Sequence, residues 1–217
     1  MPIPTPPSDL DENQPLTRGH KKRERTRRSL VDAALRLIAR KEVGEIALLE
    51  VAAEAEVSNG TIYNYFRTRD EVLEAVGITL ATEFSDAITA LSTNVKSGAQ
   101  RLSIGVRMFI RRAADDHQWA NALLRIIHFD QAIRSRLATH VLDDLREGRR
   151  EGAFTFNDEG IAMDIVVSCT TGAMRSVVEG RAVTGHDVQV AEMVLKALGT
   201  TPARARKIAG LPLPASS

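Results

Sequence analysis

The sequence lacks several features that mark other classes of protein. Cys169 is its single cysteine, so no intramolecular disulfide can form. It has no run of eighteen apolar residues and no apolar N-terminal stretch, so we expect neither a membrane span nor a signal peptide. Its 29 basic and 28 acidic residues give a net charge of +1, which excludes a uniformly polybasic nucleic-acid binder. We therefore expect a cytoplasmic globular protein, with any nucleic-acid affinity confined to a local patch.

Motifs for common catalytic chemistry are absent as well. There is no Gly-x-Ser-x-Gly elbow, no phosphate-binding glycine loop with a lysine, and no cysteine pair for zinc. His140 precedes Asp143 and Asp144 at helical spacing, but a third metal ligand is not evident and helix surfaces often produce such pairs by chance. Cys169, in an apolar helix, is expected to be a buried hydrophobe. The sequence predicts no enzyme, no metal site and no cofactor.

Composition divides the chain into four parts. Residues 1–20 contain five prolines and almost no apolar periodicity, which predicts a disordered arm. The proline-containing tail at 201–217 is expected to be irregular. Between them, helical periodicity without strand patterns predicts an all-α protein, with one domain at 21–76 and a second at 77–200.

Positive charge is concentrated near the first predicted helix. Ten basic residues between Arg18 and Lys41 face only Glu24 and Asp32. Apolar residues at helical spacing begin at Leu30, so half of this basic cluster precedes or opens an amphipathic helix. Its first turn can bring cations and backbone N–H groups to a phosphate. A solvated basic face is the alternative.

A helix-turn-helix is predicted next. Val51 and Ala55 recur at helical spacing, and Ser58 is a good N-cap for a second short helix. In that helix Ile62 and Phe66 lie four apart and can pack inward, while Asn, Thr and Tyr side chains face out. Such a face suits reading of a DNA major groove. Tyrosine at a helix–helix contact is the alternative.

The run Val-Ser-Asn-Gly-Thr-Ile-Tyr-Asn-Tyr-Phe at 57–66, with Gly44 before it and Arg-Asp-Glu-Val-Leu at 69–73 after it, resembles the DNA-binding domain of the tetracycline-repressor (TetR) family. The resemblance covers roughly residues 22–76. It implies a helix-turn-helix domain followed by a helical domain for dimerisation and ligand binding.

Three positions depart from the family pattern. Ala47 stands where a Thr or Ser normally caps the second helix, so that helix begins without a side-chain acceptor, at a cost of about 1 kcal/mol. Glu56 replaces the usual turn glycine and must accept its conformation. Asn59 replaces a common lysine, which weakens one phosphate contact or replaces it by a base contact. Four acids nearby are expected to face away from phosphates: Glu45, Glu50, Glu54 and Glu56.

The resemblance and the pattern together predict a ligand-responsive repressor that binds a palindromic operator in double-stranded DNA as a homodimer. Base-edge or groove contacts are expected from Asn59, Gly60, Thr61, Tyr63 and Asn64. Phosphate contacts are expected from Arg27, Arg28, Tyr65 and Arg69. The alternative is a helical small-molecule sensor that acts through protein contacts and has a vestigial helix-turn-helix.

In the second domain the resemblance implies a dimer interface and a cavity. The last two helices, within 158–199, are expected to pack with their symmetry mates into a four-helix bundle; the alternative is that they cover only their own subunit's core. A small-molecule effector of unknown identity is expected among the middle helices. Candidate lining residues, which ordinary core packing would explain equally, are Phe84, Met108, Phe109, Arg112, Trp119, Leu123 and His128.

Overall fold

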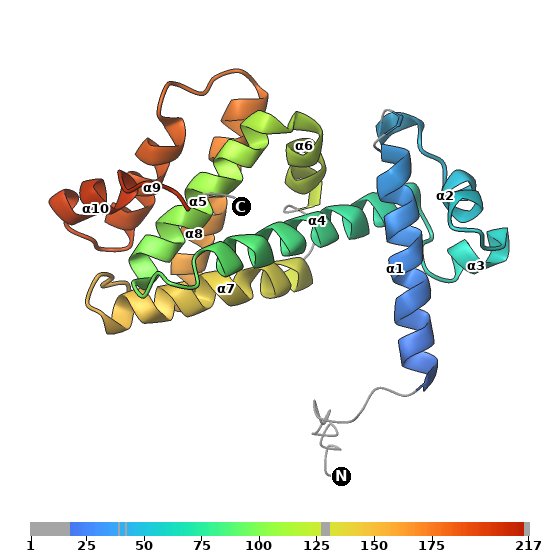
Figure 1. Cartoon of the computed structure of the whole chain (residues 1–217), viewed down its shortest axis with the longest axis horizontal. Coiled ribbons are helices and arrows are strands. Elements are labelled where there is room, and N and C mark those ends of the chain that lie inside the picture. The colour runs from blue at the N-terminus through green and yellow to red at the C-terminus, as the bar shows by residue number, and fades with distance from the viewer. Residues whose placement is uncertain (1–17, 39, 42, 127–130, 215–217) are drawn as a thin grey trace, which may run out of the picture. The chain divides into compact units, whose positions relative to one another are not determined.

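The computed structural model describes residues 18–38, 40–41, 43–126 and 131–214. This part of the chain is built from helices and contains no strand, which confirms the all-α prediction (Figure 1). It forms two compact units that divide between Arg69 and Asp70, before the expected boundary at residue 76. Most of the expected arm lies outside the described residues, and residues 18–20 are helical rather than disordered.

The described residues of the first unit form three α-helices and a single 3-10 turn at Val43–Glu45. The α-helices are α1 (Arg18–Ile38), α2 (Leu48–Glu54) and α3 (Asn59–Tyr63). α2 packs against both α1 and α3. Leu30, Val51, Ile62 and Phe66 are fully or almost fully buried in this unit. The predicted inward face of the second short helix is therefore confirmed.

The local signals of the helix-turn-helix act as the sequence predicts. Ser58 caps α3, because its Oγ accepts the backbone N–H of Thr61 at 3.2 Å. Ala47 gives α2 no side-chain cap, but its own N–H donates to Glu50 Oε2 at 3.2 Å. Glu56 adopts a φ of 56°, a left-handed conformation that costs a non-glycine residue about 1 kcal/mol.

The second unit is organised around α5. Its helices are α4 (Arg69–Leu91), α5 (Gly98–Asp115), α6 (His117–Ile126), α7 (Gln131–Arg150), α8 (Glu159–Val178), α9 (His186–Ala197) and α10 (Pro202–Ala209). α5 packs against every helix from α6 to α10. Leu102, Val106, Leu123, Met174 and Leu195 are buried in one hydrophobic core.

The expectation of an irregular tail at 201–217 is wrong for residues 202–209, which form α10. Pro202 lies in the first turn of this helix, where the missing N–H is not needed. Ala205 and Ile208 are buried, and α10 packs on α9 and α5. Beyond α10, the carbonyl of Leu211 accepts from Arg107 Nη1 at 2.5 Å.

α5 and α7 approach each other backbone to backbone at Gly98. A Cβ on Gly98 would collide with the carbonyl oxygen of Asp144 and would lie 2.6 Å from the backbone nitrogen of Gly148. Gly148 itself makes room for the ring of Phe154 and lies inside α7. Neither position can accept a side chain unless the neighbouring elements move.

Gly98→Ala is expected to lower the free energy of unfolding by about 2 kcal/mol, because the added methyl meets backbone rather than a flexible side chain. Gly105→Ala on the same helix is the matched control. Nothing lies within 4 Å of its added Cβ, so it is expected to raise stability by about 0.5–1 kcal/mol through helix propensity. Urea denaturation of both variants tests the pair, and two shifts of the same sign would contradict it.

Candidate nucleic-acid interface and ligand cavity

An open groove in the first unit lies between the beginning of α1 and α3. Its walls are formed by Gly19, Lys22, Arg23, Thr26, Thr61, Asn64 and Tyr65. Three of these residues, all on the helix-turn-helix side, are among the predicted DNA contacts. The α1 side supplies two cations, Lys22 and Arg23, that the sequence did not single out. The basic cluster pointed to this region, but periodicity alone did not tell which cations face α3.

Two arginines of α1 stack on the aromatic rings of Tyr65 and Phe66, which follow α3 in the chain. The guanidinium carbon of Arg23 lies 5.8 Å from the centre of the Tyr65 ring, and that of Arg27 lies 5.3 Å from the centre of the Phe66 ring. Such cation–π contacts contribute about 0.5–1 kcal/mol at exposed sites. They keep positive charge next to the predicted reading helix.

Acids of α2 neutralise the other end of the basic cluster. Glu54 binds Arg36 Nε at 2.8 Å and Arg40 Nη2 at 2.7 Å, and Glu50 binds Lys41 Nζ at 2.6 Å. These hydrogen bonds lower the pKa of both carboxyl groups. Arg36, Arg40 and Lys41, at the C-terminal end of the basic cluster, are therefore paired with acids within the unit.

The predicted base-reading residues lie at the surface of α3. Asn59, Gly60, Tyr63 and Asn64 are exposed, and 51% of the Tyr63 surface is accessible. Thr61 differs, because its hydroxyl lies 2.8 Å from Ser58 Oγ within the helix cap. The exposed polar surface of this short helix is available to base edges.

The predicted phosphate contacts have varied surroundings. Arg28 is exposed and Tyr65 is half-buried beneath Arg23. Arg69 donates from Nη1 to the carbonyl of Gly44 at 2.7 Å and so fixes the segment between α1 and α2. Arg69 thus positions the unit's own backbone in addition to any contact it makes outside.

A cavity of about 230 Å³ lies within the second unit, lined by residues of α4 to α8 and of the segment after α4. Leu102, Val106, Val166 and Met174 provide much of its apolar wall. Gly105 also faces it, and the absence of a side chain there contributes to the open volume.

The predicted cavity residues separate into two groups. Phe109 and Leu123 line the cavity. Phe84 packs edge-on against Phe109 and Trp119, with ring centres 5.0 and 5.3 Å away. Neither Phe84 nor Trp119 lines the cavity. Three residues remain. Met108 does not line the cavity, Arg112 stacks on Trp119 and pairs with Asp116 at 3.0 Å, and His128 lies outside the described residues.

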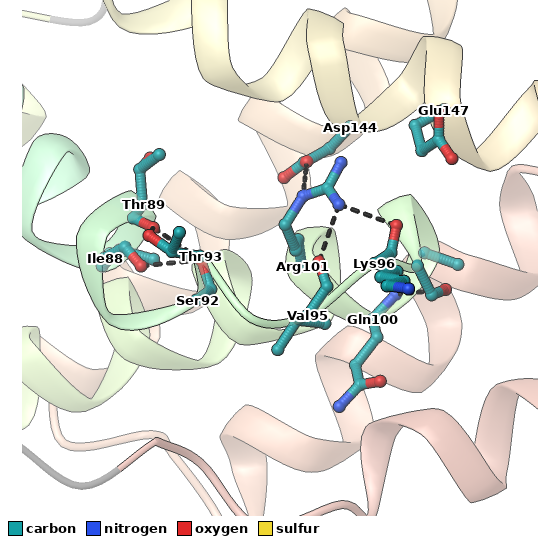
Figure 2. A network of polar contacts seen from close by, with 12 residues as sticks. Ile88, Thr89, Ser92, Thr93, Val95, Lys96, Gln100, Arg101, Asp144 and Glu147 are labelled. Atoms are coloured by element: carbon teal, nitrogen blue, oxygen red, sulfur yellow. Dashed lines mark hydrogen bonds and ion pairs between the residues drawn. The ribbon is translucent and has the colours of Figure 1, made fainter.

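The polar end of the cavity depends on one arginine (Figure 2). Arg101 Nε donates to Asp144 Oδ1 at 2.5 Å, and Arg101 Nη1 donates to the carbonyls of Val95 and Lys96, both at 2.8 Å. The side chain therefore joins α5, α7 and the segment that follows α4. The sequence did not single out Arg101, since its partners lie on elements far away along the chain.

Burial raises the pKa of Asp144 to about 6, although the hydrogen bond from Arg101 acts in the opposite direction. The negative charge of Asp143 raises this pKa further and His140 lowers it. Asp144, Asp143 and His140 all line the cavity. No cluster of three or more His, Cys, Asp or Glu residues suited to a metal ion occurs within the described ranges.

Both parts of the chain match known families. Residues 98–210, just over half of the chain, match the tetracyclin repressor-like C-terminal domain, and residues 30–76 match the tetR family of bacterial regulatory proteins. An uncharacterised helix-turn-helix transcriptional regulator of Haemophilus influenzae is 44% identical over 45 residues, 21% of this chain and 24% of that protein. The chain thus aligns with about a quarter of that curated relative.

Solved structures share the fold over most of the chain. RolR in complex with resorcinol has a TM-score of 0.74 at 26% identity, covering 91% of this chain and 99% of that one. FadR of Bacillus subtilis in complex with stearoyl-CoA has a TM-score of 0.56 at 18% identity, covering 81% and 98%. The second likeness concerns the fold alone.

Asp144 is expected to make the protein relatively more stable in mild acid. Its pKa is about 6 in the fold against an ordinary 3.8, so the folded state binds a proton that the unfolded state releases. That stabilisation is complete below the unfolded value and is lost as pH rises through about 6. The free energy of unfolding relative to Asp144→Asn should therefore increase by about 1 kcal/mol from about pH 7.5 to about pH 5. A constant difference in denaturation experiments would contradict this.

Proposed function

Since the chain belongs to the tetracycline-repressor family of bacterial transcriptional regulators, we propose that it is a repressor that binds a palindromic operator as a homodimer and releases it when a small molecule enters the cavity. The fold and family are those of regulators rather than enzymes. The groove of the first unit carries this proposal, because it combines cations on one side with an exposed polar helix on the other.

Phosphate binding is assigned to the α1 side of the groove. Lys22 and Arg23 are exposed there, whereas Arg36, Arg40 and Lys41 already pair with acids of α2. The counterion-release term of DNA binding then depends mainly on the first turns of α1. Base reading is assigned to the exposed side chains of α3.

An exposed apolar face supports the proposed dimer. Ile161 on α8 and Met193 on α9 are 64% and 63% accessible, unusually high for large apolar side chains. Contrary to the sequence expectation, Cys169 is exposed too. Within the described residues α8 is also the one helix long and apolar enough to cross a membrane, but it packs on α5, α6, α7 and α9. A second copy would cover its free side.

The dimer gives the reading helix its specificity. A five-residue helix such as α3 contacts too few bases to select one operator. Two copies related by a two-fold axis read two half-sites about 34 Å apart or a multiple of that. This is why the proposed operator is palindromic.

The volume of the cavity limits the proposed effector. An apolar cavity of about 150 Å³ in another protein binds benzene. At about 230 Å³, the present cavity suits one ring with small substituents. Resorcinol, the ligand of RolR, is of this size, whereas stearoyl-CoA, the ligand of FadR, is far larger. We therefore assign the effector to small ring compounds.

Lys22→Ala and Arg23→Ala should each weaken binding to all DNA sequences and reduce the salt slope by about 1, because each removes a phosphate contact. Arg36→Ala is the matched control, since Glu54 already pairs with its charge. Fluorescence anisotropy at several salt concentrations measures the slope, starting with DNA that flanks the gene. Absence of any salt-dependent complex would favour the sensor with a vestigial helix-turn-helix.

The two residues that follow α3 should respond differently to substitution. Tyr65→Ala should lower affinity for specific and random DNA alike, because its ring supports a cation at the backbone-binding side. Asn64→Ala should instead relax preference at one or two base pairs, at about 1–3 kcal/mol. Binding to a library of operator variants separates these outcomes. Equal losses on specific and random DNA for both variants would refute the division.

A further inference from the structure

Four of the five hydroxyl groups in the cavity wall donate their protons within the protein; the fifth belongs to Ser85. Thr89, Ser92, Thr170 and Thr171 each donate to the carbonyl oxygen of the residue four positions earlier, at 2.7 to 3.0 Å. All four line the cavity. A hydroxyl has one proton and two lone pairs, so each of these oxygens retains only acceptor capacity.

The imidazole of His140 and the guanidinium of Arg101 also direct N–H donors to acceptors within the protein. His140 Nε2 lies 2.9 Å from Asp86 Oδ1, and a carboxylate only accepts, so the Nε2 proton is directed to Asp86 and not to the cavity. Arg101 directs Nε and Nη1 to Asp144 and to two carbonyls, which leaves one amino group. Apart from the Ser85 hydroxyl and one amino group of Arg101, the polar groups of the wall therefore offer mainly acceptors.

The net charge of the cavity wall also disfavours an anionic ligand. Asp143 and Asp144 supply two negative charges to the cavity wall, against one from Arg101. A ligand carboxylate would lose its hydration and meet this negative balance without enough donors to compensate. A hydroxyl group can instead donate to Asp144, since a carboxylate has about four acceptor sites and Arg101 uses one.

We propose that Asp144 determines effector specificity by accepting a hydrogen bond from the hydroxyl group of a neutral phenol, and that this cavity excludes aromatic carboxylates. A phenol combines a strong donor with a ring that suits the apolar wall around Phe109 and Leu123. This assignment rests on the proposed ligand response and defines its chemistry.

Three probes that share a ring test the assignment in calorimetric titrations of the full-length protein. Resorcinol carries two donors, 1,3-dimethoxybenzene carries none, and 3-hydroxybenzoate carries one donor and a carboxylate. Resorcinol should bind at least about tenfold more tightly than either of the others. Gly105→Leu, which fills the space beside the wall, should abolish resorcinol binding and so place it in the cavity.

Asp144→Asn should weaken resorcinol binding by about tenfold or more, because it removes the charged acceptor. Asp115→Asn, at the exposed end of α5 and outside the cavity, is the control and should leave affinity unchanged.

The pH dependence of resorcinol binding by the wild-type protein provides a further test. Affinity for resorcinol should fall by about tenfold from about pH 7.5 to about pH 5 as Asp144 is protonated, and Asp144→Asn should lose this dependence. The groups that face Asp144 are Arg101 on α5 and His140 and Asp143 on α7. A pH dependence that persists in Asp144→Asn would contradict the assignment.

Comparable or tighter binding of either comparison probe would overturn the inference, as would no binding of resorcinol at millimolar concentration. The salt-dependent DNA titration is independent of these results. If the protein binds DNA but does not show the expected resorcinol selectivity, its proposed role as a regulator stands and the assignment of Asp144 is lost. If it binds resorcinol but no DNA, the proposed role as a regulator is lost and the assignment of Asp144 stands.

Discussion

The second unit depends on the backbone-to-backbone contact between α5 and α7 at Gly98. Because no side chain separates the helices there, Arg101, one turn later on α5, reaches Asp144 on α7. Two turns beyond Gly98, Gly105 faces open space instead. The same pair of helices is thus tightly packed at one end and hollow further along. This arrangement holds a charged pair at the edge of an apolar cavity, where burial keeps the pKa of Asp144 high.

A comparable division of charge occurs in the first unit. Acids of α2 pair with Arg36, Arg40 and Lys41, while Arg23 and Arg27 stack on the aromatic rings that follow α3 in the chain. Part of the basic cluster therefore stabilises the unit and part remains at its surface. A near-neutral chain can present a local cationic surface in this way without an excess of basic residues elsewhere.

The sequence predicted what depends on neighbouring residues. Helical periodicity, the Ser58 cap and the turn conformation of Glu56 are local, and all three were correct. The polar wall of the cavity was not predicted as a ligand site, because Arg101 meets Asp144 across 43 residues of chain. Periodicity identified Phe109 correctly as inward-facing but did not separate the cavity wall from the aromatic cluster behind it. α10 was missed because the three prolines of the tail, of which only Pro202 lies in this helix, predicted irregular structure, whereas the burial of Ala205 and Ile208 comes only from tertiary contacts.

At Gly105, substitution can change the choice of ligand without disturbing the fold. A side chain at this position would enter the cavity without touching a neighbouring backbone, so its size sets how much volume is left for a ligand. Larger residues there would also favour the helix, since glycine costs about 1 kcal/mol relative to alanine. Single substitutions at this one position therefore offer descendants of the protein a short route to new effectors, with no loss of stability to oppose them.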